Sequence, residues 1–130
     1  MSAEFRPFKA KDLDSFEVQG AHKMILQAVK LRPLAMINAE DSLWSFTMWA
    51  DGKPRACAGA DGEGGLWVFL APDLKKHMVS LTRYGMAMID AHRRLSGPVH
   101  AEIDPSHKEA VRWVRLAGFR QINHLVWVYP

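Results

Sequence analysis

Cysteine is nearly absent from this 130-residue chain, in which Cys57 stands alone. A single thiol cannot close an internal disulfide, which excludes the small disulfide-stabilised secreted folds and fits a reducing compartment. Long apolar runs are also missing, since no window approaches the ~18 apolar residues that span a bilayer. Residues 1–12 mix charges among apolar side chains and contain no apolar signal core. We therefore expect a cytoplasmic protein.

Several catalytic signatures are missing as well. The chain has no Gly-x-Ser-x-Gly elbow and no phosphate-binding P-loop. Its six histidines stand at no diagnostic spacing from another His, Cys or carboxylate, so no metal site is predicted. Glu63 and Glu102 border predicted strands and are candidate general bases, against the simpler interpretation that both are solvated.

The residues that are present describe a globular protein. Hydrophobic residues make up 48% of the chain and charged residues 24%, and the length fits one domain over 1–130. Five tryptophans favour a large aromatic core or an interface. The net charge is −1 over residues 1–65 and +4 over residues 66–130. The basic half fits either an anionic partner or an ordinary solvated surface.

Hydrophobic periodicity predicts alternating strands and helices. An Asp-Gly turn at 51–52 joins two strands as a hairpin, and the small residues of the second strand, which include Cys57, leave room for a close neighbour. Gly85, within the longest apolar helix, suggests that this helix packs closely on a sheet. The predicted strands cover 5–8, 44–50, 55–60, 66–70, 99–103 and 124–129, and the predicted helices cover 21–31, 73–95 and 106–118.

This order predicts an α/β fold, with a mixed sheet, an antiparallel N-terminal meander, a central β-α-β crossover and a C-terminal helix and strand. The strand over 66–70 is apolar throughout, which is typical of burial on both faces. The apolar positions of the long helix recur at steps of three and four and form one buried seam. They are Leu74, Met78, Leu81, Gly85, Met88, His92 and Leu95.

The stretch PSHKEAVRWVRLAGF, residues 105–119, contains sequence signals for both the start and the end of a helix. Ser106 and Glu109 fit a capping box, Gly118 can end the helix, and Phe119 should pack beneath that end. A basic stripe runs along one side at steps of four and three, and its members are Lys108, Arg112 and Arg115. We interpret it as a solvated face, because no nucleic-acid motif accompanies it.

This stretch resembles the final helix motif of the GCN5-related N-acetyltransferases (GNAT family), which reads Asn-x-x-Ala, then an aromatic residue, then Gly-Phe. Ala110, Gly118 and Phe119 match it. The order of elements also resembles that family over essentially the whole chain. The resemblance implies a GNAT-like fold and, in active members, transfer of an acetyl group from acetyl-CoA.

The chain departs from that family where the chemistry lies. The family's cofactor loop, Gln/Arg-x-x-Gly-x-Gly/Ala, follows the fourth strand, and its backbone amides hold the pyrophosphate. The matching window here, residues 75–80, has neither glycine. His107 replaces the family's Asn, and Val114 replaces the Tyr that protonates the departing thiolate, so no catalytic residue is assigned. The cofactor contacts that the resemblance implies are Leu70, Lys75, Lys76, His77 and Met78.

The opening FRPFKAKDLDSFEVQGAHKMIL and the Trp-rich sheet resemble a narrower group, the small GNAT-like internal virion or morphogenesis proteins of short-tailed bacteriophages. That resemblance implies a location in the host cytoplasm or the virion. Two hypotheses follow. The first is a degenerate acyl-CoA site in a protein that binds a protein partner during virion assembly or host modulation. The second is an active acyl-CoA-dependent N-acetyltransferase, with acetyl-CoA as its cofactor. We expect no membrane partner, set nucleic acid aside, and leave open a homodimer formed through a sheet edge that includes the final strand.

Overall fold

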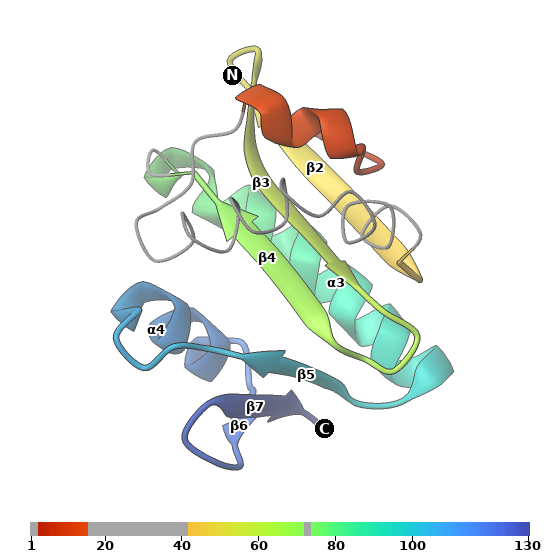
Figure 1. Cartoon of the computed structure of the whole chain (residues 1–130), viewed down its shortest axis with the longest axis vertical. Coiled ribbons are helices and arrows are strands. Elements are labelled where there is room, and N and C mark those ends of the chain that lie inside the picture. Colours follow the sequence, from red (N-terminus) through yellow and green to blue (C-terminus); the bar gives the residue numbers. More distant parts are fainter. Residues whose placement is uncertain (1–2, 16–41, 72–73) are drawn as a thin grey trace.

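The computed structural model describes residues 3–15, 42–71 and 74–130. The first sheet has the order β1-β2-β3-β4 with antiparallel neighbours, and the second has the order β5-β7-β6 (Figure 1). The first sheet contains β1 (Glu4–Arg6), β2 (Trp44–Ala50), β3 (Lys53–Ala60) and β4 (Leu66–Leu70). The second contains β5 (Val99–Glu102), β6 (Arg120–Gln121) and β7 (Val126–Tyr129).

Within the described residues, the helical elements are two 3-10 turns, η1 (Ala10–Ser15) and η3 (Lys75–His77), and two α-helices, α3 (Met78–Ser96) and α4 (Lys108–Leu116). Helix α3 connects β4 to β5, which confirms the predicted β-α-β crossover and the α/β class (Figure 1). The predicted helix over 21–31 lies outside the described residues. No helix of the described ranges is long and apolar enough to cross a membrane.

The β2–β3 hairpin turns where the Asp-Gly pair predicts. Asp51 and Gly52 both have positive φ, 55° and 73°, as a tight two-residue turn of the primed type requires. The small residues of β3 do leave room for a neighbour. A Cβ on Gly59 would lie 2.7 Å from the indole of Trp67, so the close neighbour is a core tryptophan of the adjacent strand.

Strand β4 is covered on both faces, as its continuous apolar run predicts. Phe69 belongs to a buried cluster with Phe8, Leu13 and Cys57, and Trp67 packs against that cluster. Val68 and Leu70, which alternate with them, pack against a second cluster that contains residues of α3. Several β4 side chains are only half-buried because part of that second face borders a cavity.

Helix α3 begins five residues later than expected, after the turn η3, and its apolar seam is shorter than the sequence predicts. Leu81, Gly85, Ile89 and His92 are buried, whereas Leu95 is 85% exposed, so the prediction for Leu95 is wrong. The helix projects past the sheets at that end. The interpretation of Gly85 is also wrong, because a Cβ there would meet no atom within 4 Å.

Helix α4 ends as predicted but does not begin as predicted. Gly118 has φ 98°, and the Phe119 amide donates to the Val114 carbonyl at 2.9 Å, with Phe119 buried. At the start, His107 is the N-cap and its side chain makes no capping bond. The Ser106 hydroxyl instead donates to Asp104 at 2.8 Å, so its predicted role in a capping box is wrong. The Asp104 carboxylate also accepts a hydrogen bond from the Ser106 amide. Ser106 is therefore part of a local turn with Asp104 and does not cap the helix.

The final strand lies in the middle of its sheet. Trp127 and Val128 of β7 pair with β5 on one side and with β6 on the other. The expectation that this strand offers a free edge for dimerisation is therefore wrong over those residues.

Candidate functional site

The two sheets meet at one point and then separate. A single parallel bridge joins Gly65 to His100, and the His100 amide donates to the Gly64 carbonyl at 2.8 Å. Gly64 has φ 90°, and a Cβ on it would lie 2.4 Å from the Pro98 carbonyl oxygen. Only glycine permits this approach. Beyond it, β4 remains in the first sheet and β5 in the second, so the two strands diverge (Figure 1). A cleft lies between them.

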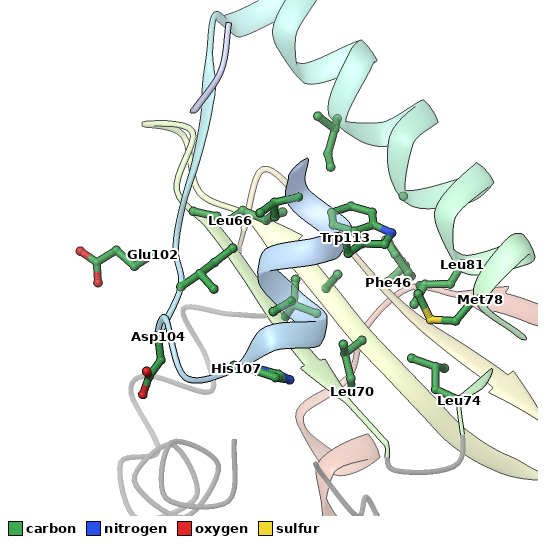
Figure 2. A pocket seen from close by; sticks show the side chains of 18 of the residues that line it. Phe46, Leu66, Leu70, Leu74, Met78, Leu81, Glu102, Asp104, His107 and Trp113 are labelled. Carbon is green, nitrogen blue, oxygen red and sulfur yellow. The ribbon is translucent and has the colours of Figure 1, made fainter. Parts of the chain in front are cut away.

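A cavity of about 240 Å³ occupies this cleft, and its lining is mostly apolar. Strands β2 to β4 supply one wall, α3 a second and α4 a third (Figure 2). The principal apolar contributors are Phe46, Val68, Leu70, Leu81, Ile89, Trp113 and Val114. We call this space, with these lining residues, the β4–β5 cleft.

The backbone of both strands also faces the cleft. The Ala71 amide donates to the carbonyl of Arg55 in β3. In this antiparallel ladder, the backbone N–H and C=O groups of odd-numbered residues along β4 therefore point toward β3, and those of even-numbered residues, such as Val68, point away from it. The Ile103 amide likewise donates to the Leu125 carbonyl, so the backbone of Glu102 faces away from β7. The cleft therefore presents two strand edges, which suit an extended ligand that contains amide groups.

The rim of the cleft is polar. Asp104 and Glu102 are exposed and His107 is half-buried. Figure 2 shows the Glu102 carboxylate directed away from the cavity and the His107 ring beneath the start of α4, on the side of Leu70. The Ser106 amide and hydroxyl lower the pKa of the Asp104 carboxyl, and the nearby charges of His107 and His124 act in the same direction. Of Glu102 and His107, it is therefore His107 whose ring lies on the side of Leu70, a residue that lines the cavity.

The centre of α4 offers the cleft no group that can release a proton. Val114, at the position where the resemblance expects tyrosine, is 3% exposed and lines the cavity. Trp113 beside it uses its indole N–H to donate to the Thr82 hydroxyl of α3 at 3.0 Å. This bond connects the two helical walls of the cleft and leaves no donor at its centre from either residue.

The five predicted cofactor residues separate into two groups. Leu70 and Met78 line the cleft. Lys75 and Lys76 are exposed on η3, and His77 is buried with its Nε2 4.0 Å from a carboxylate oxygen of Asp51, in the β2–β3 turn. The assignment of these residues to a cofactor stays a prediction. Glu63, the other candidate base, is exposed in the turn before β4 and lies outside the lining of the cleft.

The described residues fit one part of acetyl-CoA better than another. The apolar cleft with its strand edges suits a narrow, amide-containing arm. At the start of α3, however, Met78 directs a side chain into the cavity, where the glycine of a phosphate loop would leave backbone open (Figure 2). The described charges there come only from the exposed Lys75 and Lys76. The residues fit the arm and do not fit the pyrophosphate.

Sequence reasoning did not identify the cleft walls or the role of Asp104. The Asp-x-Ser spacing before α4 is a turn signal that points to Asp104. No local pattern in the sequence shows that the indole of Trp113 reaches Thr82, 31 residues away.

Solved structures of other proteins have a fold similar to that of this chain. No protein-family model and no curated protein matches this sequence. Among solved structures, the PaiA N-acetyltransferase of Thermoplasma acidophilum in complex with coenzyme A is similar, with a TM-score of 0.70 and 11% identity over 98% of this chain and 97% of that one. The ribosomal-protein-S5-alanine acetyltransferase of Vibrio fischeri gives 0.66 and 10% over 99% and 93%.

A third similar structure is a mutant of the AtaT toxin bound to the C-terminus of the antitoxin AtaR, with a TM-score of 0.62 and 12% identity over 100% of this chain and 92% of that one. At these identities the likeness shows the fold alone. The predicted GNAT-like fold is confirmed.

Proposed function

We propose that this chain uses the GNAT fold as a binding module, with an acyl-CoA site too degenerate for acetyl transfer, and acts through a protein partner. The observation that supports this most is the apolar lining at two places. Met78 fills the cleft at the start of α3, and Val114 stands at the centre of α4 where the resemblance expects a proton donor. Neither the thioether side chain of methionine nor the hydrocarbon side chain of valine can hold a phosphate or act as a general acid.

The sequence of the loop between β4 and η3 supports the same proposal. It reads Pro72-Asp73, and proline has no backbone N–H while aspartate adds a negative charge. Both features disfavour an anionic pyrophosphate. The cleft itself remains an apolar cavity, which a scaffold can keep when the chemistry is lost.

We further propose that the partner belongs to phage virion assembly or to host modulation. This rests on the resemblance of the opening sequence and Trp-rich sheet to the internal virion proteins of short-tailed phages. A GNAT-fold neighbour, the AtaT toxin, is bound to part of another protein, its antitoxin, which is compatible with protein binding by this fold.

One observation favours the second candidate, an active N-acetyltransferase. His107 lines the cleft, and an imidazole can accept and donate a proton, as a general base or acid must. In that function His107 would exchange the proton that Val114 cannot.

Measuring thiol release from acetyl-CoA separates the two candidates. The purified chain is mixed with acetyl-CoA and, in turn, spermidine, an aminoglycoside and an N-terminal alanine peptide as acceptors. We expect no release above the buffer rate. Turnover with any acceptor that is lost in His107→Ala and kept in the control His124→Ala, an exposed histidine outside the cleft lining, would establish the enzyme instead.

A further inference from the structure

The outer side of α4 carries a second concave surface. A shallow groove of about 310 Å³ is lined by Pro105, Lys108, Val111, Arg112, Arg115 and Leu116. We call this surface the α4 groove. It shares no lining residue with the β4–β5 cleft, because the side of α4 that faces the cleft consists of other residues, including Trp113 and Val114. A ligand in one therefore leaves the lining of the other untouched.

The α4 groove is strongly basic. Lys108, Arg112 and Arg115 are exposed and follow one another at steps of four and three, over about 10 Å of helix at ~1.5 Å per residue. Among the residues whose side chains the structure describes, which do not include Glu109, no carboxylate forms an ion pair with these three cations. Arg115 lies over the Trp127 ring at 5.7 Å, a contact that orients its guanidinium without neutralising it.

Apolar side chains line the α4 groove together with these cations. Leu116 is 80% exposed, Pro105 is exposed, and Val111 is half-buried. A helix face that served only to keep the chain in solution would gain nothing from an exposed leucine next to exposed arginines. Apolar surface bordered by polar groups is typical of an interaction site.

We propose that the α4 groove docks an acidic peptide segment of a protein partner, in which apolar side chains alternate with aspartate or glutamate. The carboxylates pair with Lys108, Arg112 and Arg115, and the apolar side chains cover Leu116 and Pro105. This inference names the chemistry of the partner and so rests on the proposed binding function.

Charge alone would also suit a nucleic acid, but the groove favours a peptide. Single-stranded nucleic acids bind through stacking on aromatic side chains together with a groove of positive charge that follows the backbone. The lining of the α4 groove contains three cations and no aromatic residue. A phosphate backbone would leave Leu116 and Pro105 without an apolar partner.

The test is selection of a random twelve-residue peptide display library on the immobilised full chain, followed by fluorescence anisotropy with the enriched peptides. We expect enriched sequences to combine two or more acidic residues with a leucine or an aromatic residue. The double variant Arg112→Glu with Arg115→Glu should weaken their binding at least tenfold, and Leu116→Ala severalfold. These side chains are exposed, so the variants should fold normally, which circular dichroism checks.

The matched control is Lys53→Glu with Arg83→Glu, which makes the same change of charge at two exposed positions outside the groove and should change affinity less than twofold. The proposal is overturned if selection enriches no such sequence, or if groove and control variants behave alike. It is also overturned if a twelve-nucleotide oligo-dT binds the groove as tightly as the peptides. Acetyl-CoA binding by the wild type would contradict the degenerate cleft and leave the peptide result standing, so the two failures are distinguishable.

Discussion

A buried chain of three polar side chains joins the turn η1 to the strands β2 and β3. The Thr47 hydroxyl donates to the Asp12 carboxylate at 2.8 Å and lies 3.5 Å from the Cys57 sulfur. Cys57 is fully buried, and burial raises the pKa of its thiol to about 12. The thiol therefore packs as a small buried side chain, and because it stays protonated it is no nucleophile.

Cys57 should therefore resist a thiol reagent while the chain is folded. At pH 8 we expect no reaction with dithionitrobenzoate in native buffer and one thiol per chain in guanidinium, followed by absorbance. Since the folded pKa lies above the ordinary value of 9.0, the neutral thiol stabilises the fold below pH 9, and this contribution is lost as the pH rises toward 12. Rapid reaction in native buffer would contradict the burial.

Asp104 gives a second prediction at the same scale. Its carboxylate accepts from the Ser106 amide and hydroxyl, so its pKa should fall below the ordinary 3.8, measured by carbon-13 NMR of the carboxyl group. The stabilisation of this turn is present above pH 3.8 and is lost as the pH falls through the lowered pKa. Ser106→Ala removes the hydroxyl donor and should move the pKa back upward. An unchanged pKa of Asp104 in that variant would show that the Ser106 hydroxyl does not lower it.

Secondary structure elements meet most closely at Gly64, where β4 and β5 join. Gly64→Ala places a methyl group 2.4 Å from the Pro98 carbonyl oxygen at positive φ, so we expect a loss of about 1–3 kcal/mol or more in the free energy of unfolding. The matched change is Gly85→Ala in α3, whose Cβ meets nothing within 4 Å and should stabilise the helix by about 0.5–1 kcal/mol. Urea unfolding measures both, and equal effects would contradict the described junction.

The two helical walls of the cleft are coupled through Trp113 and Thr82. Thr82→Val removes the acceptor while keeping the shape, so we expect a loss of about 1 kcal/mol and a changed fluorescence of Trp113. Thr82→Ser keeps the hydroxyl and serves as the control. If valine and serine give the same stability, the hydrogen bond does not stabilise the wall.

Much of the element order follows from the sequence, because period-two and period-3.6 patterns are local. The turn at Asp51-Gly52 and the end of α4 at Gly118 can also be predicted, because their sequence signals are local. The missed features depend on distant partners. Nothing near Leu95 in sequence shows that the helix extends past the sheets, and the cleft arises only where β4 and β5 diverge after the Gly65–His100 bridge.

At the scale of the whole molecule, the fold is that of the GNAT structures, and the proposal concerns the residues that line its cleft. Two sheets joined by one bridge, with α3 and α4 as walls, produce the cleft of the GNAT fold. The residues on its surface come from local sequence and can change without loss of the fold. Val114 and Met78 line the cleft with apolar side chains where the resemblance implies polar contacts, while the α4 groove has its cations on the outer side of α4.

The central claim, a GNAT fold without a working acyl-CoA site, is tested most directly by calorimetric titration of the purified chain with acetyl-CoA. The PaiA enzyme of Thermoplasma acidophilum, whose structure contains coenzyme A, serves as the positive control. We predict no saturable heat from this chain up to millimolar acetyl-CoA. Micromolar binding that is weakened in Lys75→Ala with Lys76→Ala would contradict the claim and identify a phosphate site at η3.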